Sequence, residues 1–527
     1  MKTTRRARKS RMTAAIATLC SAAAFASFAV FQAEATTGTT YYLNCATGED
    51  GADGTSPTTA WRSLSKVNSL TFGPGDQLLL ARGATCTGTL FPRGSGANGA
   101  PFIISDYGTS SSKAVINGNG TAQAIRLLNS QYVELSNLEV TNPVPPTVSN
   151  PIRRGVDIGL HEIGVGRHIV VKDLYIHDIL GSDEKGEAGS QGIIFRVSGN
   201  TVPTHFDDVQ ILRNRLVHVD RQGILVTPGA WAYRPEEDST KKPGKAWTPA
   251  TGVVVRDNWL DNIGGDGIVM NTTDGAKVEY NTIRGFQMRS AYWNAGIWPY
   301  NSNSTLVQYN NVVGGDPRGT HKDGMAYDVD QGNIGTVFQY NYSANNKGGF
   351  FLLCQNGPGI IRNAVIRYNV SQNDEFRGFE NCAGKIESAS IYNNAIFIGD
   401  GIDQTVVNEN NTNLRNVTFR NNIVRKVGKG TANFRLQSGG YTFDHNAFSP
   451  WMRNLPLNPS GITADPLFMN PNAATSRVVA RGYRLQTGSP ALAAGAVIPN
   501  NGGQDFYGSP VPSDTAPNIG AYEGPGR

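Results

Sequence analysis

Three aspartates within one short segment are the residues best suited to chemistry in this sequence. Residues 319–330 read GTHKDGMAYDVD and contain Asp323, Asp328 and Asp330. On an extended strand, Asp328 and Asp330 point to the same face, with Cα atoms about 7 Å apart. Repulsion between two close carboxylates raises the pKa of one, which leaves a carboxylic acid beside a carboxylate. Cleavage of a glycosidic bond uses such a pair, so we predict that these three aspartates are catalytic.

A second group of residues has the types that bind sugars. Aromatic rings stack on pyranose faces, and charged groups bind hydroxyls. Trp298 and Tyr300 could alternatively pack beneath a long loop as a satellite core. Asp beside Gly is also an ordinary turn residue, so Asp266 and Asp323 have a structural alternative. The predicted substrate-binding residues are Asp266, Arg196, Trp298, Tyr300, His321, Lys322, Arg377 and Glu380.

An internal repeat supplies the elements that would position these residues. The repeat Asn residues are 23 to 31 positions apart, and short apolar strands with turn residues between them are typical of a parallel β-helix. Asn suits the sharp turn because it tolerates the left-handed conformation and can stack in ladders. The repeat reads VVVRDN (253–258), VEYN (278–281), VQYN (307–310), FQYN (338–341), IRYN (366–369), IYNN (391–394), FRNN (419–422) and FDHN (443–446), with repeat Asn at 258, 281, 310, 341, 369, 393, 421 and 446.

A second repeated phrase assigns side chains to the two faces of a sheet. Counting from its Gly, positions one and three are apolar and should point inward, while positions two and four should face solvent. This alignment gives Asp266 and Asp323 equivalent positions on different coils, and it turns Phe351 and Leu353 outward. The phrase reads QGIIFRV (191–197), QGILVTP (222–228), DGIVMNT (266–272), AGIWPYN (295–301), DGMAYDV (323–329), GGFFLLC (348–354) and RGFENC (377–382).

These repeats resemble those of the pectate-lyase-like β-helix superfamily of secreted carbohydrate-active enzymes. Residues 39–83 are similar to the N-terminal cap of many bacterial members, with Thr59 capping a short helix (59–69) over Trp61, Leu64 and Val67. ADPLF (464–468), YRLQTGSPALAAG (483–495) and IGAYE (519–523) are similar to the C-terminal closing segment. The resemblance implies an all-β, right-handed parallel β-helix solenoid with a short N-terminal capping helix.

Three functions are compatible with this superfamily. Glycoside hydrolases on this fold use clustered Asp residues, which implies such a role for Asp323, Asp328 and Asp330 and requires no cofactor. A polysaccharide lyase would need a Lys or Arg base, such as Lys322 or Arg196, together with Ca²⁺. Residues 322–353 are similar to family 9 polysaccharide lyases, but Asp328 stands where their catalytic Lys would be. We rank hydrolase first, lyase second and non-catalytic glycan-binding surface protein third.

The N-terminus and the cysteines predict export. Arg and Lys residues at 5–11 precede an apolar run at 12–31, and Ala33-Glu34-Ala35 has small residues where signal peptidase cleaves. We therefore predict a signal peptide over residues 1–35 and a secreted, extracellular protein. Export permits disulfides, and we predict the pairs Cys45–Cys86 and Cys354–Cys382. No CxxC motif or Cys/His cluster suggests a metal site.

Charge and length set the remaining expectations. The 527 residues have a net charge of +5 without a stripe of clustered Lys and Arg, which argues against a nucleic-acid partner. We expect a monomer that binds a polysaccharide or oligosaccharide and no membrane. The expected organisation is an N-terminal cap with the first coils (36–115), a β-helix with the active site (116–450) and a closing segment (451–527).

Overall fold

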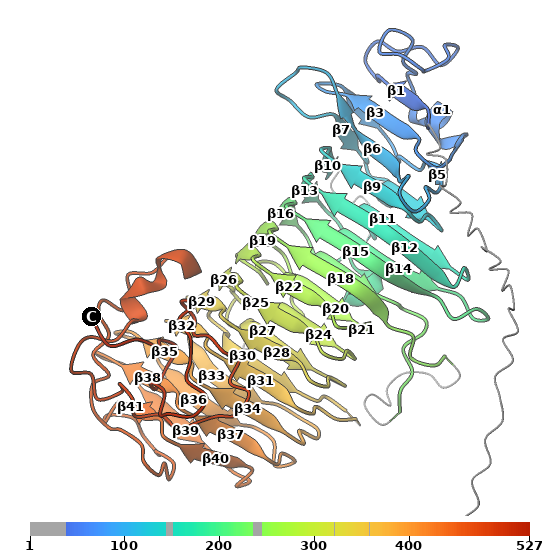
Figure 1. The fold of residues 1–527 in the computed structure, drawn as a ribbon. Coiled ribbons are helices and arrows are strands. Elements are labelled where there is room, and N and C mark those ends of the chain that lie inside the picture. The colour runs from blue at the N-terminus through green and yellow to red at the C-terminus, as the bar shows by residue number, and fades with distance from the viewer. Residues whose placement is uncertain (1–37, 144–150, 236–244, 321, 358) are drawn as a thin grey trace, which may run out of the picture. The chain divides into compact units, whose positions relative to one another are not determined.

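The computed structural model describes residues 38–143, 151–235, 245–320, 322–357 and 359–527 (Figure 1). The chain separates into residues 1–35, where the predicted signal peptide lies outside the described ranges, and one compact unit, Thr36–Arg527. Within the described ranges, no helix is long and apolar enough to cross a membrane.

Three parallel sheets form the body of the unit Thr36–Arg527, and each coil of the chain adds a strand to them in turn. Sheet 1 comprises β1 (Thr40–Leu43), β3 (Gln77–Ala81), β6 (Phe102–Tyr107), β9 (Val133–Ser136), β12 (Val165–Lys172), β15 (His205–Leu212), β18 (Ala250–Arg256), β21 (Thr273–Asp274), β22 (Lys277–Glu279), β25 (Leu306–Gln308), β28 (Val337–Gln339), β31 (Ala364–Arg367), β34 (Ala389–Tyr392), β37 (Val417–Arg420) and β40 (Tyr441–Asp444). Sheet 2 comprises β4 (Thr85–Thr87), β7 (Val115–Asn117), β10 (Glu139–Asn142), β13 (Tyr175–Ile179), β16 (Arg215–Val219), β19 (Trp259–Ile263), β23 (Thr282–Arg284), β26 (Asn311–Val313), β29 (Tyr342–Ala344), β32 (Val370–Gln372), β35 (Ala395–Ile398), β38 (Ile423–Lys426) and β41 (Ala447–Phe448).

Sheet 3 carries the predicted functional residues. It comprises β8 (Gln123–Leu128), β11 (Arg154–His161), β14 (Gln191–Ser198), β17 (Gln222–Thr227), β20 (Ile268–Asn271), β24 (Ala295–Tyr300), β27 (Met325–Asp330), β30 (Gly349–Cys354), β33 (Phe376–Asn381), β36 (Gln404–Glu409) and β39 (Ala432–Arg435). A further pair is formed by β2 (Thr71–Phe72) and β5 (Arg93–Gly94). One continuous apolar core runs between the three sheets, because every second side chain of each strand points inward. The predicted right-handed parallel β-helix is confirmed.

The N-terminal cap contains the predicted helix, but the helix is shorter than predicted. It is α1 (Leu64–Asn68), and its N-cap is Ser63, whose Oγ accepts a hydrogen bond from the Lys66 N–H. Thr59 does not cap it, because its hydroxyl donates to Asp53 within the preceding turn. The helix does bury Leu64 and Val67 over the end of the core as predicted. Two short 3₁₀ helices, η1 (Gly186–Ala188) and η2 (Arg477–Tyr483), complete the helical elements of the described ranges.

The predicted Asn ladder lies at the corner between sheets 1 and 2. Each ladder Asn after the first accepts, at Oδ1, the backbone and side-chain N–H groups of the preceding ladder Asn, at 2.9 to 3.0 Å for Asn258, Asn281 and Asn310. The ladder members are Asn214, Asn258, Asn281, Asn310, Asn341, Asn369, Asn394, Asn422, Asn446 and Asn458.

The prediction misplaced the turn conformation by one residue. The left-handed residue is the one before each ladder Asn from Asn214 to Asn446, with φ near +58° at Tyr280, Tyr309 and Tyr340. Asn393 and Asn421, predicted as ladder members, occupy this turn position instead, and their neighbours Asn394 and Asn422 form the ladder. Because two Asn residues are consecutive at 393–394 and at 421–422, the sequence could not show which of each pair joins the ladder.

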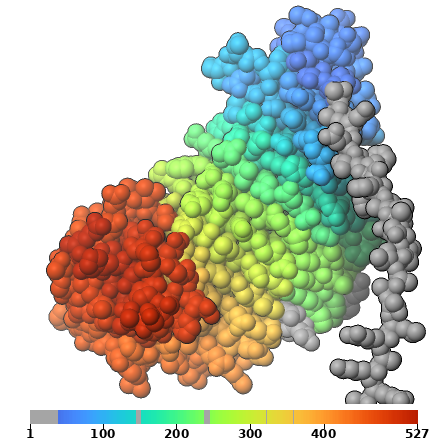
Figure 2. All heavy atoms as spheres, in the orientation of Figure 1, coloured from blue at the N-terminus to red at the C-terminus, as the bar shows by residue number. Residues whose placement is uncertain are grey.

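The C-terminal segment covers the side of the coils as well as their end. Residues 452–462 continue the last coil, and the chain then folds back, so that the Arg477 N–H donates to Asn311. A second apolar cluster forms there between the row of Tyr340, Tyr368 and Tyr392 and residues of the segment. In Figure 2 this segment forms a continuous red patch beside the orange coils.

Both predicted disulfides are present. Cys45 and Cys86 join the cap to the first coil, with Cα atoms 5.3 Å apart. Cys354 and Cys382 join two consecutive coils of sheet 3, with Cα atoms 4.9 Å apart.

Candidate active site

The outer face of sheet 3 presents two columns of side chains. In one column, Trp298 lies beside Asp328, because Ile297 pairs with Tyr327, and Asp328 then pairs with Leu352. In the other column, Tyr300 lies beside Asp330, which pairs with Cys354. Strand register alone therefore places the aromatic pair one coil before the aspartate pair.

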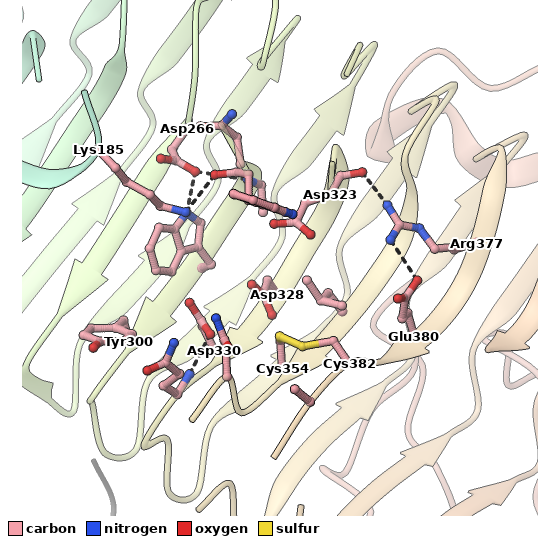
Figure 3. A pocket seen from close by; sticks show the side chains of 18 of the residues that line it. Lys185, Asp266, Tyr300, Asp323, Asp328, Asp330, Cys354, Arg377, Glu380 and Cys382 are labelled. Carbon is pink, nitrogen blue, oxygen red and sulfur yellow. Dashed lines mark hydrogen bonds and ion pairs between the residues drawn. A yellow bond between two sulfur atoms is a disulfide. The ribbon is translucent and has the colours of Figure 1, made fainter. Parts of the chain in front are cut away.

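A cavity of about 770 Å³ opens over these columns. It gathers eight of the predicted site residues: Asp266, Trp298, Tyr300, Asp323, Asp328, Asp330, Arg377 and Glu380. The other lining residues are Lys185, Asn271, Trp293, Asn294, Ala295, Gln331, Leu352, Cys354, Asn356, Cys382, Ala383 and Asn410. Figure 3 shows Asp328 near the centre, between Asp323 and Asp330.

The three aspartates differ in environment. Burial raises the pKa of Asp323 to about 6; Lys185 and Arg377 oppose this rise, and Glu380 and Asp266 add to it. Burial, followed by the charges of Asp330 and Asp323, raises the pKa of Asp328 well above its usual value. Asp328 is only 5% exposed, and its Oδ1 has no hydrogen-bond partner within the described part of the chain. Asp330 is partly exposed and accepts the Gln331 N–H at 2.8 Å. The segment thus holds carboxyl groups whose environments differ, as acid–base chemistry requires.

The predicted alignment of the second phrase was wrong in two places. Asp266 is aligned with Ala295, and Ala295 pairs with Met325, so Asp323 lies two residues before the position equivalent to Asp266. One coil later, Tyr327 pairs with Phe351, so Phe351 and Leu353 point into the core and Leu352 faces the cavity. The corrected register also stacks Cys354 directly on Cys382, because Leu353 pairs with Asn381.

Asp266 lines the cavity, but its carboxylate is engaged by the protein. Its Oδ1 accepts the Trp298 Nε1–H at 3.0 Å and the Ala295 N–H at 3.1 Å. Its Oδ2 accepts Gln222 Nε2 at 3.3 Å and forms an ion pair with Arg221 at 3.2 Å. Asp266 is fully buried, and both of its carboxylate oxygens are occupied by these contacts. The carboxylate therefore holds the indole of Trp298 and is not free to contact a substrate.

Trp298 and Tyr300 belong both to the cavity and to a satellite core. Ile194, Leu225 and Val269 precede Trp298 in the same column and pack with it on the outside of sheet 3. Trp298 is 7% exposed, and its ring meets Tyr300 edge-on at 6.3 Å. The satellite core considered from the sequence is therefore present and ends at the cavity wall, and sugar binding by the two rings stays a prediction.

Arg377 and Glu380 form the wall on the other side of Asp328. Arg377 donates to Glu380 at 2.8 Å and to the backbone carbonyl of Asp323 at 2.6 Å (Figure 3). Both side chains are about 5% exposed. Arg377 therefore fixes the backbone of a candidate catalytic residue from a strand two coils further on.

Two predicted residues lie outside the cavity lining, and a third cannot be placed. Arg196 pairs with Asp157 on the neighbouring strand, at 2.8 and 3.1 Å. Lys322 donates to the Ala291 carbonyl at 2.9 Å and lies over the ring of Trp293 at 4.6 Å. His321 lies outside the described residues.

The sequence interpretation missed Lys185 and Trp293. Lys185 Nζ donates to the Trp293 carbonyl at 2.7 Å and lies 5.1 Å from the centre of the Trp298 ring. Both residues come from loops beside sheet 3, where no strand alternation assigns a face. Lys185 precedes the phrase at 191–197 in a stretch that matches neither repeated phrase, and this departure from the repeat was the available signal for it. Among the described residues, no group of three or more His, Cys, Asp or Glu side chains is arranged to hold a metal ion.

Comparisons with known proteins agree with this architecture. No protein-family model matches the chain. A lacto-N-biosidase of Bifidobacterium longum subsp. longum is 28% identical over an alignment of 597 positions, which covers 93% of this chain and 36% of that relative. The chain therefore spans just over a third of the relative's length.

Solved structures share the fold. A GH136 lacto-N-biosidase from Eubacterium ramulus superposes with a TM-score of 0.60 at 24% identity, covering 75% of this chain and 68% of that chain. XylC in complex with xylose superposes with a TM-score of 0.50 at 10% identity, covering 92% of this chain and 98% of that chain. The chain thus shares the parallel β-helix fold of these structures.

Proposed function

We propose that this protein is an exported glycoside hydrolase that acts on an oligosaccharide containing lacto-N-biose. The observation that carries the proposal is the convergence of Asp323, Asp328 and Asp330 in a cavity walled by Trp298 and Tyr300. The similarity to lacto-N-biosidases supports the substrate class. Export is supported by the basic and apolar residues at 5–31 and by two disulfides, which persist in oxidising compartments.

The environments of the aspartates suggest their roles. Asp323, with a pKa of about 6, is suited to give its proton to the glycosidic oxygen as the anomeric C–O bond breaks. Asp330 is partly exposed and is suited to act as the carboxylate that meets the positive charge developing at the anomeric carbon. The raised pKa of Asp328 favours its protonated form, which can donate a hydrogen bond to the substrate or to Asp330. The proposed enzyme works as a monomer and without a cofactor.

The lyase alternative has less support than it had from the sequence. Its candidate bases were Lys322 and Arg196, and neither of them lines the cavity. Lys322 is engaged with Ala291 and Trp293, and Arg196 is engaged with Asp157.

A two-channel assay tests the proposal. The purified protein is incubated with p-nitrophenyl lacto-N-bioside, and released p-nitrophenol and free disaccharide are measured. Pectin and alginate are assayed in parallel for the absorbance of unsaturated uronates. We expect disaccharide release by the wild type and release at least about a hundredfold slower by Asp330→Asn. Uronate absorbance would favour the lyase, and binding without cleavage in either channel would favour a glycan-binding protein.

A further inference from the structure

Arg221 is a buried arginine that lies behind the cavity and does not line it. It follows β16 and precedes β17, and its side chain is fully buried. Its guanidinium lies 3.2 Å from Asp266 Oδ2, as an ion pair without hydrogen-bond geometry at Nη2. A buried arginine is costly unless several groups compensate its charge and its donors, so its partners indicate what the protein gains from it.

Those partners come from three separate segments. Arg221 Nε donates to the Glu184 carbonyl at 3.3 Å and lies 3.8 Å from the Asp183 carboxylate. Its Nη1 donates to the side chain of Asn294, and its guanidinium lies 5.9 Å from the centre of the Tyr292 ring. Together with Asp266, these contacts join the 183–185 loop, the 292–294 loop and sheet 3.

Each of the three segments supplies a cavity residue close to the Arg221 contact. The first loop presents Lys185, and the second presents Trp293 and Asn294. Asp266 holds the indole of Trp298 through its other carboxylate oxygen. The Asn294 carbonyl accepts the N–H of Gly324, next to Asp323.

The fold also leaves room for this arginine. A Cβ on Gly265 would lie 1.7 Å from Arg221 Nη1, and a Cβ on Gly189 would lie 2.9 Å from its Cγ and 2.1 Å from the Glu184 carbonyl oxygen. The two loops also bond each other, since Tyr292 donates to Glu184 at 2.9 Å and the Ala291 N–H donates to Asp183 at 3.1 Å. Arg221 is therefore the common partner of two loops that form one wall of the cavity.

We propose that Arg221 is a positioning residue of the active site: through Asp266, Glu184 and Asn294 it holds Trp298, Lys185 and Trp293 in the arrangement that binds the substrate. Its kinetic consequences rest on the proposed hydrolase function. Its structural consequence, the tethering of the two loops, does not.

The test is Arg221→Lys, which keeps the charge but cannot contact all three segments at once. Hydrogen exchange is measured on peptides covering residues 182–188 and 290–294. We expect both peptides to exchange faster than in the wild type, while peptides from β31 and β34 are unchanged. Arg477→Lys is the matched control, because Arg477 donates to the Tyr340 and Phe506 carbonyls at the C-terminal segment, away from the cavity.

Kinetics provides the second readout. With the p-nitrophenyl glycoside, we expect KM to rise about tenfold in Arg221→Lys, with a smaller change in kcat, since substrate-contacting groups are displaced. Trp298→Phe removes the Nε1–H that Asp266 holds, so combining it with Arg221→Lys should raise KM by less than the product of the two single effects.

Three outcomes decide the inference. Unchanged exchange in both loops, with only a lower Tm, would overturn it and leave Arg221 as a residue that stabilises the fold. Multiplicative effects of Arg221→Lys and Trp298→Phe on KM would overturn the link to Trp298. If the wild type cleaves no glycan, the proposed function fails, and the exchange comparison alone decides the role of Arg221.

Discussion

Two stacks of side chains in this protein obey the same geometry and serve different purposes. The Asn ladder repeats one residue type on successive coils, and each member completes the hydrogen bonds of its neighbour. The outer column of sheet 3 runs Ile194, Leu225, Val269, Trp298, Asp328, Leu352 and Glu380, so it is aliphatic over three coils and then changes its chemistry at each coil. In a solenoid, uniform columns maintain the fold, whereas a column whose composition changes abruptly marks a site.

The largest expected effect is a loss of activity when Asp330 or Asp323, beside the outer column of sheet 3, is replaced. Asp330→Asn and Asp323→Asn should each reduce kcat by about a hundredfold to ten-thousandfold, the usual contribution of a positioned acid or base. The Tm should change little, because the shape of each side chain is kept. Initial rates and thermal melts measure both effects, and full activity in either variant would place the site elsewhere.

A substitution in the Asn ladder should have the opposite effect, lowering stability and leaving activity intact. Asn310→Ala leaves the Asn281 donors and the Val278 carbonyl without their partner inside the protein. We expect a loss of roughly 3 kcal/mol of unfolding free energy, measured by denaturant titration, because unsatisfied buried polar groups are costly. The activity of the folded fraction should be retained. Asn433→Ala, at a half-buried position of β39, is the control and should cost much less.

The pH profile tests which of the cavity's aspartates is the acid. If Asp323 is the acid, kcat/KM should decline above about pH 6, because its pKa is about 6 and the acid must be protonated. Lys185 lowers this pKa, so Lys185→Met should move the alkaline limb to higher pH. A limb that stays in place in this variant would contradict the assignment of the acid to Asp323.

Asp328→Asn should separate stability from catalysis. The pKa of Asp328 is raised in the folded state, so the folded protein keeps a proton that the unfolded chain loses above about pH 4. The wild type therefore loses stability as pH rises from this value toward the raised pKa, and the variant does not. We expect the Tm of Asp328→Asn to exceed that of the wild type by a few degrees at pH 7 and to match it at pH 4. Its activity should fall about tenfold, comparable to one hydrogen bond.

The smallest expected effect is that of Lys322→Ala. Lys322 is engaged with Ala291 and Trp293 outside the cavity lining, so a hydrolase should keep activity within about threefold of the wild type. A lyase that used this base would lose its activity, so progress curves of the variant on each substrate discriminate the two reactions.

The strands, and the parity of their faces in every coil of the second phrase except β30, could be predicted from the sequence, because apolar residues alternate with a period of two in copy after copy. The predicted register failed where the copies differ in length, as between Ala295 and Met325, since matching glycines did not reveal the two-residue shift. Arg196 was assigned to the site by its face, but the sequence could not show that Asp157 on the next strand would pair with it. Lys185 belongs to a loop, and only the folded arrangement places its amine over Trp298.

The returning C-terminal segment has a consequence for how the chain acquires its structure. Successive ladder residues are 12 to 44 positions apart, so neighbouring coils can form in succession as the chain emerges. The bond from Arg477 to Asn311 spans 166 residues, and the bond from Gln504 to Tyr309 spans 195. The row of Tyr340, Tyr368 and Tyr392 therefore stays exposed to solvent until the C-terminal segment has been synthesised and has packed against it. The tyrosine side chains of coils that formed earlier are thus buried only when the chain is complete.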